Sequence, residues 1–439
     1  MNVVLKWCLR IVLLTGIWGV PLMSQELSKE SKAFLAARDA DAQERMTFAV
    51  RSALQGNFSL LNRVRSGMLQ DAEPPSGVRV ENTRVADRRI RFYFPGAVSG
   101  KAIVLYLHGG GWTLGGLEGS ARFCGDLAKV SGLDVATLDY RLAPEHRASA
   151  ALEDVLAAVR MLRERGYRRI YLAGDSAGGN LAASAAGKER SAIAGVILYY
   201  PVVLAKNDRS ESWRKYGTGF GLDGSLMEAF NESYAPGALA EDPAVSPLLA
   251  KECAHYPETL IVAAECDVLH DQGKAFAELL KKNGVPVTHR TLSGTIHAFM
   301  TYPGMEQAYQ EGLCLAVNFL NRKENSMKQV ITPESIVRIS RIEVDPAQLP
   351  EYLALVTECG RESMAKEPGV YLMYSMQEKA HPERISILEI YADRAAYEHH
   401  IQTPHFQKYK QGTLKMVRKL ELLDQHPLVP EMKMKEGAG

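Results

Sequence analysis

The chain has 439 residues, and 46% of them are hydrophobic, which is enough to bury the cores of two domains. Its 52 Lys and Arg residues balance 51 Asp and Glu residues, and the two signs are interspersed along the chain. This composition argues against a basic nucleic-acid-binding surface and against an acidic tail. The expected partners are therefore small molecules, and no nucleic acid is expected.

The chain begins with the pattern of a secretory signal peptide, predicted for residues 1–24. Lys6 and Arg10 precede an apolar run from Ile11 to Met23, which is shorter than the roughly 20 residues of a membrane-spanning helix. Removal of this segment leaves a secreted or periplasmic protein without stable membrane association. An uncleaved membrane anchor and a misassigned start are the alternatives.

Five cysteines lie beyond the predicted signal, at positions 124, 253, 266, 314 and 359, and none forms a CxxC pair. An odd number without paired spacing is typical neither of a disulfide scaffold nor of a zinc site. Neither a metal ion nor a cofactor is expected, although one incidental disulfide is compatible with an oxidising compartment.

Residues 25–84 are predicted to form a polar helical region, and residues 85–322 to form an α/β domain. In the second range, short β-rich runs such as AIVLYL (102–107) and TLIVAAE (259–265) alternate with helical patterns such as 151–165. Near-continuous apolar strands indicate a mostly parallel sheet with helices on both faces. In such sheets the ligand site lies at the carboxyl ends of the strands.

An insert at 204–245 interrupts this alternation and contains Trp213, Tyr216 and Phe220. Together with the helical region at 25–84, it is expected to cover the strand ends as a lid. Surface decoration is the alternative for both segments. The three aromatic residues are candidates for binding substrate under such a lid.

The segment YLAGDSAGGN (171–180) places Ser176 in a G-x-S-x-G pattern. In this motif a strand turns sharply into a helix and holds the serine at the tip, where the helix N-terminus favours a developing negative charge. The pattern alone is weakly specific, but here it follows an apolar strand and precedes a helix of small residues. Ser176 is therefore predicted to be a nucleophile.

A serine hydroxyl needs a base that takes its proton and an acid that orients this base. Asp267 follows the strand-like run 259–265, and His297 follows the next run, so the chain order is Ser, Asp, His. Hydrolases with this serine elbow use the same order. We predict that the strand ends bring the three residues together; a solvated loop histidine is the alternative for His297 taken alone.

The stretch IVLYLHGGGWTLGG (103–116) ends an apolar strand in three glycines. Attack on an acyl carbonyl creates an oxyanion, which needs preorganised N–H donors about 3 Å away. The amides of Gly109, Gly110 and Ala177 are predicted to be these donors. Gly111 is predicted to permit the turn. A phosphate-binding loop is rejected because no Gly-Lys-Ser/Thr ending follows.

These motifs together resemble the hormone-sensitive-lipase-like esterase family over about residues 80–322. The likeness is carried by HGGGW (108–112), DYRLAPEH (139–146), GDSAGG (174–179), DPAVSPLLA (242–250) and the pair Asp267 and His297. The resemblance implies an α/β-hydrolase fold with a lid. It also implies a serine esterase that hydrolyses short- to medium-chain carboxylic esters through an acyl-enzyme on Ser176. Trp112, next to the glycines, is a further candidate for binding substrate.

A polar segment at 323–328 is predicted to be a linker, followed by a second domain at 329–425 and a tail at 426–439. The second domain shows a β-α-β-β-α-β order, which is typical of ferredoxin-like α+β folds. Its sequence, above all HHIQTPHF (399–406), resembles the antibiotic-biosynthesis-monooxygenase-like family of dimeric α/β barrels. This resemblance implies a homodimer.

Members of that family with known activity oxidise phenols or quinols with dioxygen and no cofactor. His400 and His405 are candidates for lining such a pocket, and capping or anchoring a helix is the alternative. Three functions are therefore consistent with the sequence. They are a serine esterase with an accessory domain, an enzyme that hydrolyses an ester and then oxidises the released phenol, and a non-catalytic ligand-binding protein. The complete triad argues against the third.

Overall fold

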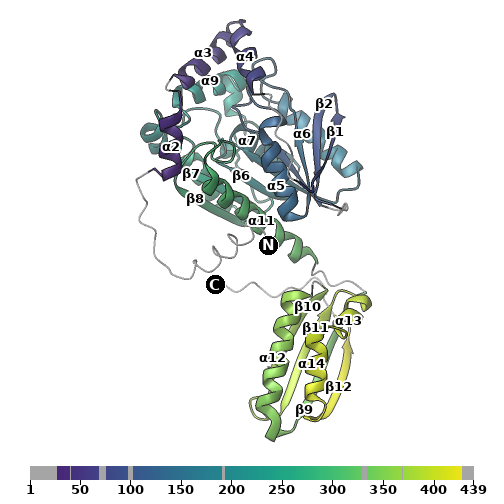
Figure 1. Cartoon of the computed structure of the whole chain (residues 1–439). Helices are drawn as coiled ribbons and strands as arrows, with labels where there is room; N and C mark the ends of the chain where they lie inside the picture. The colour runs from purple at the N-terminus through teal and green to yellow at the C-terminus, as the bar shows by residue number, and fades with distance from the viewer. Residues whose placement is uncertain are drawn as a thin grey trace. The chain divides into compact units, whose positions relative to one another are not determined.

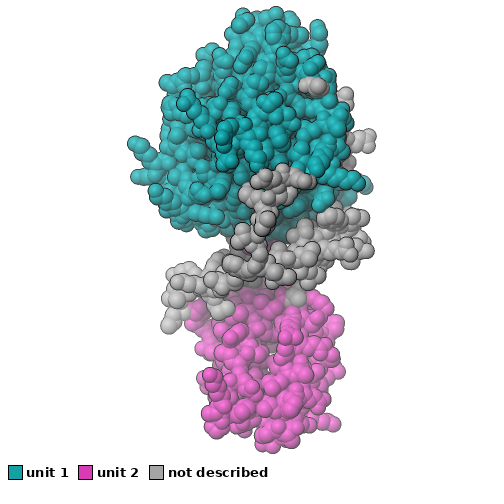
Figure 2. Space-filling model, turned by 90° about the vertical axis from the view of Figure 1, so that its left-hand side faces the viewer, with its two compact units in different colours: residues 1–320 teal, residues 321–439 magenta. Residues whose placement is uncertain are grey.

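The computed structural model describes residues 27–39, 41–68, 76–96, 102–189, 193–328, 334–367 and 369–427. The chain divides into two compact units, Met1–Leu320 and Asn321–Gly439, which Figure 2 shows in different colours. The predicted signal peptide, and all of the predicted tail except residues 426 and 427, lie outside the described residues. Within the described part of the chain, no helix combines the length and the hydropathy needed to cross a membrane.

Unit 1 is built on an eight-stranded sheet with the strand order β1-β2-β4-β3-β5-β6-β7-β8. The strands are β1 (Arg79–Val85), β2 (Arg88–Phe94), β3 (Ala102–Leu107), β4 (Asp134–Leu138), β5 (Arg169–Asp175), β6 (Ile193–Tyr199), β7 (Thr259–Cys266) and β8 (Val287–Ile296). Only the pairs β1–β2 and β2–β4 are antiparallel among these strands. The predicted mostly parallel sheet is therefore confirmed.

Helices cover both faces of this sheet, because strands that are apolar along their whole length need cover on both sides (Figure 1). One face is packed by α5 (Ala121–Ser131) and α11 (Glu306–Lys328), through side chains such as Leu127 and Leu313. The other face is packed by α6 (Ala150–Glu164), α7 (Ala177–Lys188) and α10 (His270–Lys282). The short helices η1 (Glu118–Ser120), η2 (Gly237–Glu241) and η3 (Pro247–Leu249) lie in the connections.

The two segments predicted to form a lid pack against each other. The segment 25–84 contributes α2 (Lys29–Ala37), α3 (Ala42–Leu54) and α4 (Ser59–Gly67). The insert at 204–245 contributes α8 (Glu211–Tyr216) and α9 (Gly224–Tyr234). The side chain of Gln43 accepts a hydrogen bond from the amide of Asp223 at 3.0 Å, and Arg38 donates one to the carbonyl of Gly221 at 3.0 Å. Figure 1 shows α3 and α4 beside α9 at one end of unit 1.

Two parts of the chain differ from the sequence prediction. Residues 79–84, which the prediction places in the helical region, belong to β1. This strand lies at the edge of the sheet, so its sequence RVENTRV lacks the apolar run of the central strands. Residues 323–328, which were assigned to a linker, continue α11. The stretch NRKENSMK contains neither Gly nor Pro, and Arg, Lys, Glu and Met favour helix.

His289 on β8 makes the stability of the protein depend on pH. Burial, reinforced by the nearby His270 and Lys281, lowers the pKa of His289 to about 4. The unfolded chain takes up this proton near pH 6.5, so the folded state loses stability as the pH falls from about 6.5 towards 4.

Between about pH 7.5 and pH 5, we therefore expect the free energy of unfolding to fall by about 1 kcal/mol less in His289→Gln than in the wild type. Urea unfolding at the two pH values measures the difference. His146→Gln, at an exposed position, is the matched control and should follow the wild type. Identical losses in the wild type and in His289→Gln would contradict the prediction.

Unit 2 has a four-stranded antiparallel sheet with the order β10-β11-β9-β12. Its elements are β9 (Ile336–Val344), η4 (Pro346–Gln348), α12 (Leu349–Lys366), β10 (Val370–Gln377), β11 (Arg384–Tyr391), α13 (Arg394–His400), α14 (Pro404–Thr413) and β12 (Val417–Gln425). The predicted β-α-β-β-α-β order is confirmed, with the second helix in two parts. The helix restarts at Thr403, which caps α14 and is followed by Pro404 at the first helical position.

Candidate active site

Ser176 lies at the tip of the sharp turn from β5 into α7. Its φ of 53° is a conformation that non-glycine residues rarely adopt. The amide of Ser176 donates to the carbonyl of Tyr199 at 2.9 Å, and its own carbonyl accepts from Val202 at 3.2 Å. A Cβ atom on Gly178 would overlap the carbonyl of Leu107, so the turn closes only with glycine there. These contacts hold the hydroxyl at the carboxyl end of a central strand.

The three residues predicted as a triad lie together. His297 Nε2 is 2.9 Å from Ser176 Oγ, and His297 Nδ1 is 2.7 Å from Asp267 Oδ2. The other oxygen of Asp267 accepts the amide of Leu269 at 3.0 Å. All three triad side chains are buried. Asp271, four residues beyond Asp267, instead accepts the amide of Ser212.

This arrangement determines the tautomer of His297. The Asp267 carboxylate accepts the Nδ1–H group, so Nε2 is left to accept the serine proton. The ring of Tyr200 packs against the imidazole with centroids 4.7 Å apart, and its hydroxyl accepts the amide of Met300 at 3.2 Å. Tyr200 follows the strand β6 in the sequence, and no motif marked it as a neighbour of the triad.

The amide of Gly109 is not free to bind an oxyanion, so the prediction for Gly109 is wrong. It donates to Asp175 Oδ1 at 2.8 Å, and the hydroxyl of Tyr106 donates to the same oxygen at 2.7 Å. Burial raises the pKa of Asp175, and these hydrogen bonds oppose that rise. Asp175 therefore anchors the start of the glycine loop directly beside Ser176.

Three other amides at the site are unpaired. Within the described residues, the N–H groups of Gly110, Gly111 and Ala177 have no hydrogen-bond partner. Gly110 has a φ of 108° and Gly111 a φ of 59°. A Cβ atom on Gly111 would overlap the ring of Phe230 in α9, so the lid itself approaches the backbone here. The free donors are therefore shifted one residue along the loop from the prediction.

The loop at 139–146 packs against the start of the glycine loop. Tyr140 stacks on the ring of His108 with centroids 4.3 Å apart, and its hydroxyl donates to the carbonyl of His108 at 2.8 Å. Burial lowers the pKa of His108, which favours the neutral ring. Its Nδ1 lies 2.8 Å from the carbonyl of Gly109.

Arg65 in α4 connects the lid to this loop. Its guanidinium donates to the carbonyl of Thr113 at 2.9 Å and to that of Ala143 at 2.7 Å. It also pairs with Glu145 at 2.6 Å. The sequence prediction missed Arg65 because its partners are 48 to 80 residues away along the chain.

The four predicted substrate-binding residues lie in different places. Trp112 is fully buried and stacks on Tyr234 of the lid with centroids 4.3 Å apart, so it serves packing rather than an open pocket. Trp213 is buried in the same cluster of apolar side chains. The rings of Tyr216 and Phe220 contact each other, with centroids 5.0 Å apart. Both belong to the cluster of apolar side chains that contains Ile296, next to His297.

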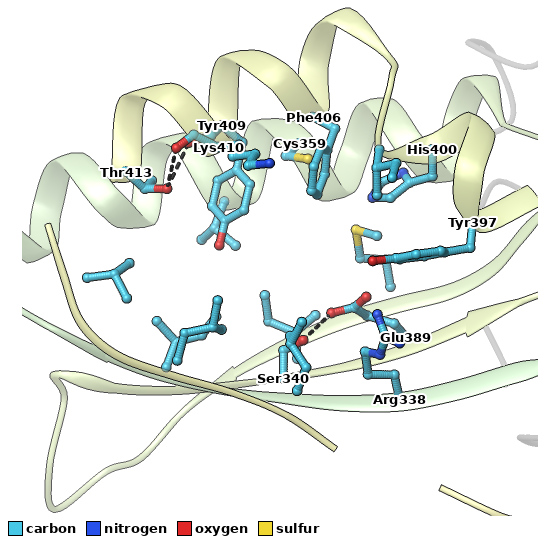
Figure 3. A pocket seen from close by; sticks show the side chains of 18 of the residues that line it. Arg338, Ser340, Cys359, Glu389, Tyr397, His400, Phe406, Tyr409, Lys410 and Thr413 are labelled. Atoms are coloured by element: carbon cyan, nitrogen blue, oxygen red, sulfur yellow. Dashed lines mark hydrogen bonds between the residues drawn. The ribbon is translucent and has the colours of Figure 1, made fainter. Parts of the chain in front are cut away.

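In unit 2, only one of the two predicted pocket residues lines the cavity. His400 forms part of the wall of a cavity of about 460 Å³, whereas His405 does not. Figure 3 shows His400 beside Phe406 at this cavity.

A family model described as an alpha/beta hydrolase fold matches residues 104–301. The ethyl acetate hydrolase of Pseudomonas putida is 36% identical over 249 residues, which cover 53% of this chain and 78% of that protein. The chain belongs to the α/β-hydrolase family.

Other proteins similar to this α/β hydrolase are named as esterases. Carboxylesterase NlhH of Mycobacterium tuberculosis is 32% identical over 277 residues, covering 57% of this chain and 86% of that protein. The structure of a hyperthermophilic esterase from Pyrobaculum calidifontis superposes with a TM-score of 0.60 at 30% identity, covering 68% of this chain and 99% of that chain. A second family model, described as antibiotic biosynthesis monooxygenase, matches residues 335–412. Both resemblances carried by the motifs are thus confirmed.

Proposed function

We propose that unit 1 of this hydrolase is a serine carboxylesterase acting on short- to medium-chain esters. The observation that carries the proposal is the chain of hydrogen bonds from Asp267 through His297 to Ser176 Oγ, at 2.7 and 2.9 Å. The esterases among its relatives support the substrate class. Unit 2 accompanies this activity as an accessory domain.

In the proposed reaction, His297 Nε2 takes the proton of Ser176, and Oγ attacks the ester carbonyl. The free amides of Gly110, Gly111 and Ala177 stabilise the resulting oxyanion. His297 then gives its proton to the departing alcohol, which leaves an acyl-enzyme on Ser176. Water, activated by the same histidine, attacks the acyl carbonyl and releases the carboxylic acid. The Asp267 carboxylate stabilises the imidazolium in both halves of the reaction.

Labelling with a fluorophosphonate probe tests this proposal. The probe should modify Ser176 in the wild type and should label His297→Ala at least 100-fold more slowly. Ser184→Ala, in the helix α7 that begins directly after Ser176, should label like the wild type. Hydrolysis of p-nitrophenyl esters of increasing chain length then defines the acyl preference. Unchanged labelling in His297→Ala would refute the proposal.

We also propose that the chain forms a homodimer through unit 2. Leu388 on β11 pairs with Tyr374 on β10 and with Ile339 on β9, and Ile339 pairs with Leu423 on β12. Successive residues of a strand face opposite sides, and Ser340 lines the cavity, so this apolar row lies on the other face of the sheet. Tyr374 is 56% and Leu423 36% exposed. In a two-fold symmetric dimer, this row on one copy packs against the same row on the other.

Charging this row should therefore separate the copies. We expect the double variant Leu388→Lys/Leu423→Lys to sediment as a monomer under conditions in which the wild type sediments as a dimer. Its esterase activity should be unchanged, because the triad lies in unit 1. Arg361→Glu, an exposed change on α12, should leave the dimer intact. Equal sedimentation of the double variant and the wild type would contradict the proposal.

A further inference from the structure

Two histidines and a glutamate of unit 2 converge on one buried point. His400 Nδ1 lies 2.9 Å from Glu367 Oε1, and His405 Nε2 lies 2.7 Å from the same oxygen. The side chains of Glu367 and His400 are 3% and 2% exposed, and that of His405 is 12% exposed. Among the described residues, these three form the one group of His, Cys, Asp or Glu side chains whose ligand atoms all lie within 4.8 Å of one another.

The position of Glu367 is set by the turn between α12 and β10. Glu367 directly follows α12, and the carbonyl of Gly369 in the same turn accepts the amide of Ala392 at 2.9 Å. A Cβ atom on Gly369 would overlap the side chain of Ala396 in α13, so glycine is needed for this close approach. The backbone itself therefore brings the carboxylate up to α13.

The two histidines flank the turn between α13 and α14. His400 is the last residue of α13, and His405 is the second residue of α14. Thr403 closes this turn, because its hydroxyl donates to the carbonyl of His400 at 2.8 Å and accepts the amide of Phe406 at 3.4 Å. The ring of Phe406 also packs on the imidazole of His400, with centroids 4.7 Å apart. Both imidazoles are therefore held in place by the turn and its packing.

The second oxygen of Glu367 has no partner. Oε2 is buried and makes no hydrogen bond within the described residues, whereas Oε1 lies beside both histidines. In the described part of the chain, the two histidines are also the only cationic side chains that pair with Glu367. A buried carboxylate oxygen without a donor or a cation is unfavourable, and in native proteins such an atom calls for a bound ion or water.

Hydrogen bonding alone is the competing interpretation of this cluster. Two N–H···O bonds satisfy Oε1 but leave Oε2 unpaired, so they account for only half of the carboxylate. A divalent ion held by one nitrogen of each ring and by both carboxylate oxygens uses all four atoms. Ligand atoms from different residues of a tetrahedral zinc site lie about 3.4 Å apart. This separation falls between the 2.7 and 4.8 Å found here, so small rotations of the rings are sufficient.

We propose that Glu367, His400 and His405 bind a divalent transition-metal ion such as Zn²⁺, which ties the end of α12 to the turn between α13 and α14. Imidazole and carboxylate ligands favour such ions over Ca²⁺ and Mg²⁺. Each coordinating nitrogen uses its lone pair, so the ring proton sits on the other nitrogen. Glu367 and His405 do not line the cavity of unit 2, and the ion is a structural one that plays no part in ester hydrolysis.

The sequence predicted no metal ion because Glu367 lies 33 and 38 residues before the two histidines. Such spacing matches none of the short patterns by which structural zinc sites are found in sequences. The three ligands become neighbours only when α12, α13 and α14 pack together.

Equilibrium dialysis of the full-length protein against Zn²⁺ and Co²⁺ tests this proposal. After treatment with a chelator, the wild type should bind one ion per chain at this site, with a Kd for Zn²⁺ of about 1 µM or below. Bound Co²⁺ should show the strong visible absorption of a four-coordinate ion, which hydrated Co²⁺ lacks. Saturation with Zn²⁺ should slow hydrogen exchange of the amides in residues 394–413 by about tenfold.

His405→Gln and Glu367→Gln should each weaken Co²⁺ binding by about 100-fold or more and abolish the visible absorption. The adjacent, exposed His399→Gln is the matched control and should bind Co²⁺ like the wild type. Circular dichroism of the chelated variants separates the loss of a ligand from the loss of fold. If Glu367→Gln does not fold, His405→Gln decides alone, because its side chain is the most exposed of the three.

Two outcomes overturn the proposal. The first is a wild type that binds no stoichiometric Zn²⁺ or Co²⁺, which leaves the cluster as a hydrogen-bonded network. The second is equal Co²⁺ binding and absorption in the wild type and in His405→Gln, which means an adventitious ion elsewhere on the chain. Esterase activity measured in the same samples should be equal with and without Zn²⁺, and a loss on chelation contradicts the structural role of the ion.

Discussion

Replacement of Ser176 by alanine is expected to lower kcat for hydrolysis of p-nitrophenyl acetate by about 10⁴- to 10⁶-fold. Alanine removes the oxygen that lies 2.9 Å from His297 Nε2, and with it the acyl-enzyme route. The residual rate comes from binding and from the free amides of the glycine loop, which the substitution leaves in place. Steady-state kinetics on the purified variant, with titration of trace wild-type enzyme, measures the loss.

The two partner residues should show that the triad acts as a unit. His297→Ala should cost about as much as Ser176→Ala, and the double variant should be no slower than either single variant. Asp267→Asn should cost about 10⁴-fold, because an amide at this position permits the wrong imidazole tautomer. Losses in the double variant that equal the product of the single losses would contradict a shared mechanism.

Asp271 provides the matched control for the acid. It is four residues from Asp267, but its carboxylate accepts the amide of Ser212 and does not contact His297. Asp271→Asn should therefore keep kcat within a few-fold of the wild type. Thermal unfolding of all variants separates a loss of chemistry from a loss of fold. A variant Asp271→Asn as slow as Asp267→Asn would assign the acid to the wrong residue.

The fold was predictable where short-range pattern and burial agree. Central strands such as 102–107 and 259–265 are buried along their whole length, so their sequences are continuously apolar. The edge strand at 79–85 is mostly polar, with the sequence RVENTRV. Its place in the sheet comes only from pairing with β2. The extension of α11 over 323–328 was hidden by its polarity, which is equally typical of a linker and of an exposed helix end.

The site shows the same division between local and distant information. Ser176, Asp267 and His297 each follow a predictable strand. Their motifs therefore placed them together at the carboxyl ends of the parallel strands. The assignment of Gly109 failed because its partner, Asp175, is 66 residues away and captures its amide. A glycine-rich sequence shows that backbone is approached closely, but it does not show which amide remains free.

Gly111 combines a free amide with a contact to the lid. Its φ of 59° lies in the left-handed region, where alanine costs about 1–2 kcal/mol relative to glycine. A Cβ atom at this position would also overlap the ring of Phe230 in α9. Since the ring is buried in the lid core, the backbone of the glycine loop is expected to yield, which displaces the amides of Gly110 and Gly111.

We expect Gly111→Ala to lower kcat by about 10²- to 10³-fold, which is the cost of losing one oxyanion donor. Phe230→Ala alone should destabilise the lid but keep most of the activity, because it leaves the loop amides in place. The double variant should recover at least tenfold over Gly111→Ala, since the obstructing ring is gone and only the backbone strain remains. Gly119→Ala, where a Cβ atom meets no neighbour, is the matched control.

The double variant decides what the third glycine is for. Recovery of kcat on removal of Phe230 means that glycine is required because the lid presses on the donor loop, so lid position and oxyanion binding are coupled through this contact. A double variant as slow as Gly111→Ala would contradict that coupling, and the loss would then arise from backbone strain at φ 59° alone. In either case fluorophosphonate labelling of Ser176 separates the two effects. Displaced donors appear as slow labelling by the probe. An unfolded loop appears as a lower melting temperature in thermal unfolding.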